Sequence, residues 1–120
     1  MFTKGFKIDP YEMFDLVAHG DCTKIKKPSP EIYEWALQKL QLPPEACLAI
    51  EDSPRGLESS NNASVKTIIT PSKLTFGENY KDAKLVISNL GEPDKHFYVI
   101  SGEPYNHSYV SFELLKMISK

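Results

Sequence analysis

Apolar positions along this chain fall into four short runs, at residues 14–18, 47–50, 65–69 and 85–87. The runs are bounded by polar, Gly- or Pro-containing segments, and several of their residues are β-branched. Short apolar runs with such boundaries predict buried β-strands. The polar segment at 70–83 has the composition of a loop.

The segment between the first two runs has apolar residues at helical spacing. Pro30 suits the first turn of a helix, and the glutamates that follow it favour the positive end of the helix dipole. The pair Pro43-Pro44 then ends the helix. The apolar stripe that predicts it consists of Ile32, Tyr33, Ala36, Leu37 and Leu40.

Two further helices are predicted nearer the C-terminal end. One begins at Pro54 with Ser53 as its N-cap and runs to about Asn62. The other is a short helix at residues 110–118, and the stretch that precedes it, from Gly91, shows no sustained period. Strands that alternate with amphipathic helices predict an α/β fold with a parallel sheet.

Two adjacent carboxylates, Glu51 and Asp52, follow the apolar strand 47–50 directly. Ligands bind at the carboxyl ends of the strands in sheets of this class. Mg²⁺ prefers carboxylate oxygens, waters and phosphate oxygens, and it would offset the repulsion between the two acids. The alternative is structural: Glu51 would cap a loop and Asp52 would accept backbone N–H bonds at the helix start.

Lys27 belongs to the sequence KKPSP, in which two prolines stiffen a loop that leads into the first helix. A lysine held in this way places a point charge against a phosphate or a phosphorylated carboxylate. The alternative for an isolated basic turn is a solvated surface.

The order of segments along residues 14–93 resembles the haloacid-dehalogenase-like (HAD) hydrolases. The segments are KKPSPEIYEWAL, an apolar strand, EDSPRGLESS and VKTIITPS. The resemblance is to the branch that contains β-phosphoglucomutase and the CbbY-like sugar-phosphate phosphatases. It implies that Lys27 stabilises a phosphorylated nucleophile, that Asp52 ligates Mg²⁺, and that Glu51 supports the metal directly or through water. It also implies that Ser53 and Gly56 shape the phosphate-supporting turn that begins the next helix.

Other parts of the family pattern are not found. The family nucleophile is the first Asp of a DxDxT-like motif, but Asp9, Asp15 and Asp21 are not followed by a second acid two residues on. The family's phosphoryl-binding Ser or Thr motif and its cap domain are not recognised either. We therefore expect the C-terminal part of such an enzyme: a partial Rossmann-like parallel sheet with flanking helices, lacking the first two strands and the cap.

This resemblance divides the chain into a leader at 1–13, the partial core at 14–93 and a C-terminal tail with a short helix at 94–120. The family's first two strands would lie between strands 14–18 and 47–50. Unless something fills that gap, both strands present unpaired edges. We then expect low stability, or self-association or complementation through these edges. Ser64 stands where the family places a Gly, which costs roughly 1 kcal/mol unless Asn62 takes the left-handed position.

Composition adds limits on location and partners. A formal charge of −2 shows no bias toward nucleic acid or anionic membranes. Cys22 and Cys47 are isolated, which predicts reduced thiols rather than a zinc site or disulfides. No signal peptide or membrane span is recognised, so we expect a cytoplasmic protein, or one of an organellar stroma if a transit peptide is missing upstream.

Three functions are compared. In its complete form, the chain would belong to a Mg²⁺-dependent phosphatase or phosphomutase that acts on a small phosphorylated sugar through an aspartyl-phosphate, although this chain alone should be inactive. A truncated, non-catalytic homologue that acts as a binding module is the alternative. A receiver domain also combines an acidic pair with Lys-Pro, but in the reverse chain order. The sequence names neither the substrate nor the choice between phosphatase and mutase.

Overall fold

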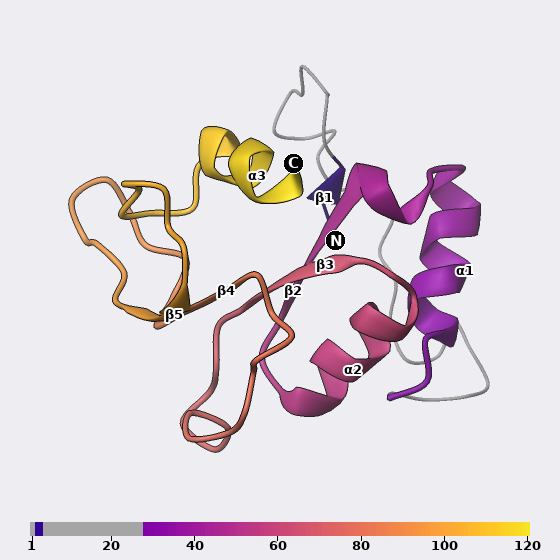
Figure 1. Cartoon of the computed structure of the whole chain (residues 1–120), viewed down its shortest axis with the longest axis horizontal. Helices are drawn as coiled ribbons and strands as arrows, with labels where there is room; N and C mark the ends of the chain where they lie inside the picture. The colour runs from indigo at the N-terminus through magenta and orange to yellow at the C-terminus, as the bar shows by residue number, and fades with distance from the viewer. Residues whose placement is uncertain (1, 4–27) are drawn as a thin grey trace.

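The computed structural model describes residues 2–3 and 28–120 (Figure 1). The predicted strand at 14–18 therefore lies outside the described residues. None of the helices in the described part is long and apolar enough to cross a membrane.

A five-stranded mixed sheet, in the order β1-β2-β3-β4-β5, forms the centre of the fold (Figure 1). The inner strands β2, β3 and β4 are parallel, as predicted, whereas β1 and β5 pair antiparallel at the two edges. The α/β fold class is therefore confirmed, with two edge strands that the pattern did not predict. The strands are β1 Phe2–Thr3, β2 Cys47–Glu51, β3 Lys66–Ile69, β4 Leu85–Ile87 and β5 Val99–Gly102.

The three α-helices lie where the pattern predicts them, within about two residues. They are α1 Glu31–Leu40, α2 Pro54–Asn62 and α3 Phe112–Ser119. A 3₁₀ turn, η2 Pro44–Ala46, follows α1 and was not predicted. Ser53 caps α2, since its Oγ accepts the Gly56 N–H at 3.1 Å. This cap satisfies a backbone donor that would otherwise have no partner in the first turn.

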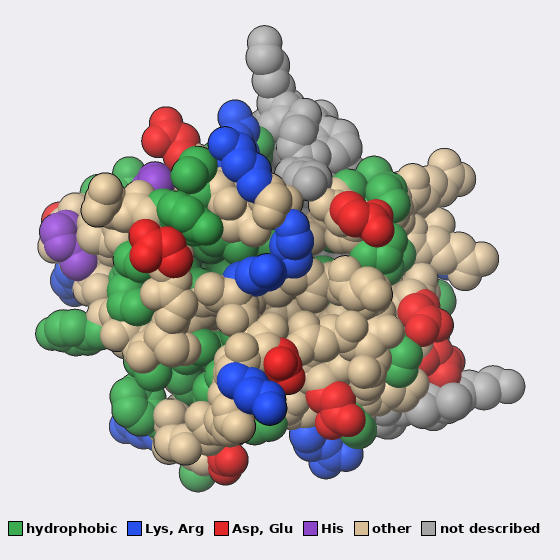
Figure 2. Space-filling model, in the orientation of Figure 1, with side chains coloured by type: hydrophobic (Ala, Val, Ile, Leu, Met, Phe, Trp, Pro, Cys, Tyr) green, Lys and Arg blue, Asp and Glu red, His purple; other side chains and the backbone are tan. Residues whose placement is uncertain are grey.

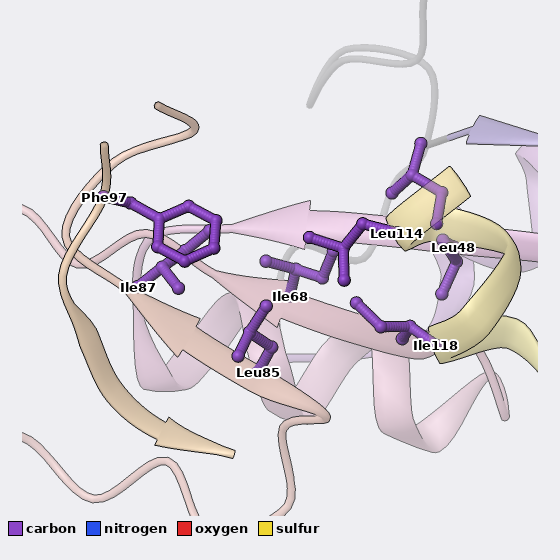
Figure 3. Packing of buried hydrophobic residues seen from close by; sticks show 8 residues of the cluster. Leu48, Ile68, Leu85, Ile87, Phe97, Leu114 and Ile118 are labelled. Carbon is purple, nitrogen blue, oxygen red and sulfur yellow. The ribbon is translucent and has the colours of Figure 1, made fainter. Parts of the chain in front are cut away.

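The two faces of the sheet are covered by different helices. Along β2, Cys47 and Ala49 pack into a cluster with α1 residues such as Tyr33 and Leu37. Leu48 points to the opposite face, into a cluster of sheet residues and α3 (Figure 3). This alternation follows from the two-residue period of a strand. The residues labelled on the α3 side are Leu48, Ile68, Leu85, Ile87, Phe97, Leu114 and Ile118.

The edge of β2 is paired over part of its length. Phe2 lies opposite Leu48 and Thr3 opposite Cys47 in an antiparallel arrangement. A segment from the N-terminal end therefore fills part of the gap beside this strand, so its edge is paired at these two positions. The other edge expected to be open belongs to residues 14–18, outside the described residues.

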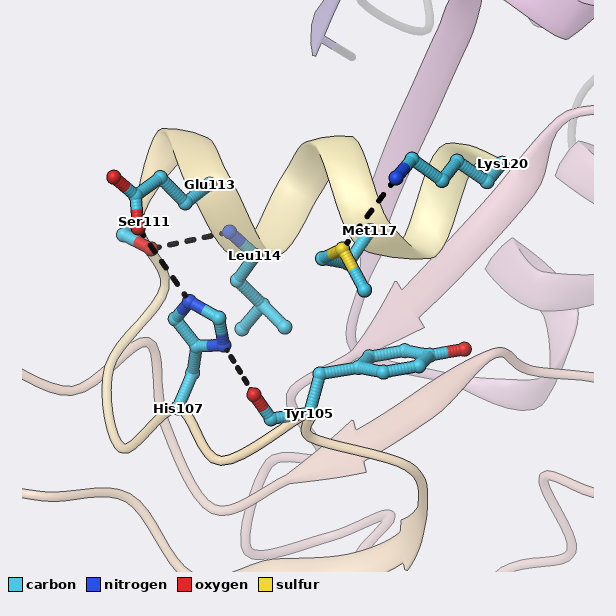
Figure 4. Close-up of polar contacts among 7 residues, drawn as sticks. All are labelled: Tyr105, His107, Ser111, Glu113, Leu114, Met117 and Lys120. Carbon is cyan, nitrogen blue, oxygen red and sulfur yellow. Dashed lines mark hydrogen bonds and ion pairs between the residues drawn. The ribbon is translucent and has the colours of Figure 1, made fainter.

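A short network holds α3 at its start (Figure 4). Ser111 Oγ accepts the Leu114 N–H at 3.1 Å and caps the helix. His107 lies beneath this turn, with Nδ1 at 2.8 Å from the Tyr105 carbonyl oxygen and Nε2 at 4.0 Å from Glu113 Oε2. The loop that follows β5 is thereby connected to the first turn of α3.

The end of α2 confirms the expectation about Ser64. Ser64, and not Asn62, adopts the left-handed conformation, with φ +62°. The Val65 N–H donates to the Ser60 carbonyl at 2.9 Å, and the Ser64 N–H donates to the Asn61 carbonyl at 2.9 Å. These two bonds form a Schellman motif, in which Gly is the usual residue at the left-handed position.

Candidate functional site

The acidic pair lies at the carboxyl end of β2, where the chain turns directly into α2 (Figure 1). Glu51 continues the alternation of Cys47 and Ala49, so its side chain lies on the face covered by α1 and α2. It is buried, with 9% of its surface exposed, whereas Asp52 is exposed. The two adjacent carboxylates are therefore in different environments.

Glu51 contacts residues from both helices of its face. The Tyr33 hydroxyl, on α1, donates a hydrogen bond to Glu51 Oε1. Gly56, in the first turn of α2, packs so closely that an added Cβ would lie 2.6 Å from Glu51 Cδ. Burial and the Glu51 carboxylate raise the pKa of Tyr33 far above its ordinary value, so this phenol stays protonated and remains a donor.

Asp52 is held through its backbone. Thr75, in the loop after β3, donates from Oγ1 to the Asp52 carbonyl at 2.6 Å. Thr75 Oγ1 also accepts the Ser72 N–H at 2.9 Å, and Tyr80 donates to the Thr75 carbonyl at 2.8 Å. The loop that follows β3 is thus attached to the turn at Glu51 and Asp52, which we call the acidic turn. The Asp52 side chain is exposed.

Ser53 and Gly56 are brought together as the sequence predicts, through the bond that caps α2. Lys27 lies outside the described residues. The loop just after it is fixed against α2, because Ser59 Oγ donates to the Ser29 carbonyl at 2.6 Å. Ser29 Oγ also accepts the Glu31 N–H at 3.3 Å, at the start of α1.

The donor chemistry of this turn is consistent with one ligand to Mg²⁺. The exposed carboxylate of Asp52 provides the hard oxygen that this ion prefers, and Mg²⁺ usually keeps several waters or phosphate oxygens. Glu51 is directed to Tyr33 instead. Within residues 2–3 and 28–120, no group of three or more His, Cys, Asp or Glu side chains could hold a metal. Asp52 thus fits a metal as one partner among several.

Sequence reasoning missed Tyr33 and Thr75. Tyr33 was assigned only to the apolar stripe of the first helix, and Thr75 only to a loop. A tyrosine hydroxyl within an apolar helical stripe is a weak signal of a site residue. Its hydrogen-bond acceptor depends on which strand the helix covers. Thr75 lies 23 residues from Asp52 along the chain, so no local pattern relates them.

Comparisons with known proteins identify relatives of this chain. The family model described as haloacid dehalogenase-like hydrolase matches residues 2–70. Protein CbbY of Rhodobacter capsulatus is 44% identical over 79 residues, which is 66% of this chain and 35% of that protein. A phosphorylated carbohydrates phosphatase of Thermotoga maritima is 37% identical over 62 residues, 52% of this chain and 29% of that protein.

Solved structures give the same result. The crystal structure of CbbY from Rhodobacter sphaeroides in complex with phosphate matches with a TM-score of 0.62 and 39% identity, over 66% of this chain and 35% of that one. A mutant of the same protein, in complex with xylulose-(1,5)bisphosphate, matches with the same values. The chain spans about a third of the length of the CbbY proteins it matches.

The HAD family typically uses Mg²⁺, and this chain is related to CbbY and to sugar-phosphate phosphatases. The resemblance inferred from the sequence is confirmed. With a family model matched from residue 2 to residue 70 and a partial HAD fold in the described residues, this chain belongs to the haloacid dehalogenase-like hydrolases.

Proposed function

We propose that this chain forms the metal- and phosphate-supporting part of a Mg²⁺-dependent phosphatase or phosphomutase that acts on a small sugar phosphate. The observation that carries this proposal is the placement of Asp52: an exposed carboxylate at the carboxyl end of a parallel strand, beside the first turn of α2. Phosphate and xylulose bisphosphate in the CbbY structures support phosphorylated sugars as the substrate class.

In this proposal Asp52 ligates the metal through a carboxylate oxygen, and Glu51 contributes negative charge from the interior side of the turn. Lys27 pairs with the transferring phosphoryl group. Ser53 and Gly56 shape the turn by capping α2. Bound Mg²⁺ would neutralise phosphoryl charge as it is transferred.

The covalent step, attack of an aspartate carboxylate on the phosphorus to form an aspartyl-phosphate, is assigned to no residue of the 120. None of the aspartates near the N-terminal end is in a DxDxT-like pattern. We therefore expect this chain to bind Mg²⁺ and phosphate without turning over an aryl phosphate by itself. Binding, rather than turnover, is the appropriate test.

The test is a titration of the ¹⁵N-labelled chain with MgCl₂, then with orthophosphate, followed by amide NMR. We expect Mg²⁺ to shift the Asp52 and Ser53 signals and this response to be lost in Asp52→Asn. Asp82→Asn is the matched control, since Asp82 is an exposed aspartate of the loop before β4. A wild-type spectrum unaffected by Mg²⁺ at this turn, or an equal response in Asp52→Asn, would contradict the proposal.

A second function, a non-catalytic interaction module, is favoured by the exposed edge strand β5. All four of its residues are exposed, and the neighbouring Tyr98 has 78% of its surface exposed. Hydrophobic side chains also gather on the side of the molecule where β5 lies (Figure 2). Concentration-dependent association that Ile100→Lys abolishes would support this function. A monomer with a sharp, concentration-independent unfolding transition would exclude self-association.

A further inference from the structure

We propose that Thr75 is a positioning residue of the candidate site. Its hydroxyl fixes the peptide group that follows Asp52, and so sets the direction in which the Asp52 side chain leaves the backbone. Thr75 contacts neither metal nor phosphate in this role, because it acts through Asp52. Its effect on Mg²⁺ binding rests on the proposed function, whereas its effect on the Asp52 backbone rests on the hydrogen bonds alone.

Asp52 lies between two peptide groups, and a hydrogen bond anchors each of them. The Glu51 carbonyl, in the peptide before Asp52, accepts the Thr70 N–H at 2.9 Å. The Asp52 carbonyl, in the peptide after it, accepts a bond from Thr75 Oγ1 at 2.6 Å. Because a peptide group is planar, only the dihedrals φ and ψ of Asp52 can vary between these two planes. Anchoring both planes therefore fixes the direction of the Asp52 Cα–Cβ bond.

Thr75 is itself held on both sides of its backbone. Its carbonyl accepts the Tyr80 hydroxyl at 2.8 Å and the Glu78 N–H at 3.2 Å, and its own N–H donates to the Ser72 carbonyl at 3.1 Å. Tyr80 is only 6% exposed and packs in a cluster with Leu57 of α2. The loop after β3 is thus attached to α2 as well as to the acidic turn (Figure 1). This gives the Thr75 hydroxyl a fixed position from which to act.

The Thr75 hydroxyl has a single proton, which it donates to the Asp52 carbonyl. The same oxygen accepts the Ser72 N–H at 2.9 Å, and Ser72 Oγ lies 3.0 Å from it. Valine has the shape of threonine but can neither donate nor accept, whereas serine keeps both abilities. Thr75→Val and Thr75→Ser are therefore a matched pair that separates the hydroxyl from the rest of the side chain.

A ligand that is already held in one direction loses less freedom when it binds a metal. We expect Thr75→Val to bind Mg²⁺ at least about threefold more weakly than wild type, because ordering the freed turn then opposes binding. Thr75→Ser should restore the wild-type affinity, since it keeps the donor. Titration with MgCl₂, followed through the Asp52 and Ser53 amide signals, measures each affinity. Equal affinities of Thr75→Val and wild type would overturn the proposal, and so would equal weakening in Thr75→Ser and Thr75→Val.

Ser60→Ala is the control for a general loss of stability. Ser60 is buried on α2, and its hydroxyl shares a 2.6 Å hydrogen bond with Thr67 Oγ1, away from the acidic turn. Losing that hydroxyl should destabilise the fold while leaving the Mg²⁺ affinity of the folded chain unchanged. If Ser60→Ala weakened Mg²⁺ binding as much as Thr75→Val, the effect of Thr75 would be one of stability, and the positioning role would be wrong.

A measurement without metal separates this inference from the proposed function. The Ser53 N–H belongs to the same peptide plane as the Asp52 carbonyl, so its ¹⁵N order parameter reports how firmly that plane is held. In the metal-free chain this order parameter should fall in Thr75→Val and return in Thr75→Ser. An unchanged value in Thr75→Val overturns the inference even if wild type binds Mg²⁺. A fall that Thr75→Ser reverses supports the positioning role even if wild type binds no Mg²⁺ and the proposed function fails.

Discussion

Thr75 Oγ1 donates a 2.6 Å hydrogen bond to the backbone carbonyl of Asp52, and so connects the loop after β3 to the acidic turn after β2. The parallel register makes this contact feasible. Glu51 lies opposite Ile69, and the Thr70 N–H donates to the Glu51 carbonyl at 2.9 Å. Two segments that leave the same edge of the sheet thus stabilise each other beside the candidate site.

The bond between Thr75 and Asp52 is tested by Thr75→Val, which keeps the shape and removes the hydroxyl. We expect the free energy of unfolding to fall by about 1 kcal/mol, the usual contribution of such a bond. Amide hydrogen exchange in the loop after β3 should become faster. Ser72→Ala is the control, since it removes only the exposed 3.0 Å contact between Ser72 Oγ and Thr75 Oγ1. Equal effects of the two variants would contradict the prediction.

Gly56→Ala tests the packing between α2 and Glu51. Alanine in a helix usually stabilises relative to glycine by up to about 1 kcal/mol. Here we expect a loss of stability instead, because the added Cβ would meet the Glu51 carboxyl group. Urea unfolding measures the difference. In a Glu51→Ala background the collision is removed, so Gly56→Ala should no longer destabilise.

The matched control for that experiment is Gly77→Ala. An added Cβ at Gly77 has nothing within 4 Å, so its substitution should change the free energy of unfolding by less than about 0.5 kcal/mol. If the single variant Gly56→Ala, with Glu51 unchanged, proves as stable as wild type, the packing described for α2 and Glu51 is wrong.

Ser64→Gly should stabilise the protein by roughly 1 kcal/mol, because a non-glycine residue with φ +62° is disfavoured by contact between its Cβ and the backbone. Thermal or urea unfolding gives the value. Asn62→Gly is the opposite case: Asn62 is the last residue of α2, so a glycine there should be neutral or destabilising. A stabilisation from Asn62→Gly as large as that from Ser64→Gly would argue against a left-handed requirement at Ser64.

Lys66 holds the far end of α3 against the sheet. Its Nζ donates to the Ser119 carbonyl at 2.9 Å and to the Lys120 carbonyl at 3.1 Å. A cation at the negative end of a helix contributes about 0.3–1 kcal/mol at low salt. Lys66→Met should lower stability by about that amount and speed amide exchange in the last turn of α3.

The control is Lys84→Met, at an exposed lysine just before β4, which should leave α3 unchanged. The loss in Lys66→Met should shrink at high salt, because salt screens exposed charges. A salt-independent loss would mean that Lys66 acts through packing of its aliphatic chain instead.

The local pattern of the sequence determined the inner part of the fold. Short apolar runs located β2, β3 and β4, because inner strands of a parallel sheet are buried on both faces. The apolar stripe located α1, the Ser53-Pro54 start located α2, and a short helix was predicted where α3 lies. β5 was missed because all four of its residues are exposed, so it lacks the alternation of a half-buried strand. β1 has only two residues, too few for any period.

The sequence by itself also identified the acidic pair and the cap at Ser53, because each is a local relation between neighbouring residues. Ser64 was singled out by the resemblance to the HAD family, which places a Gly at that position. Only the tertiary structure separated Glu51 from Asp52, directing one to Tyr33 and leaving the other exposed. It likewise attached Thr75 to the acidic turn. Such contacts depend on which helix covers which face and which loops leave the same edge of the sheet. Those are properties of packing between segments far apart along the chain, which local spacing does not encode.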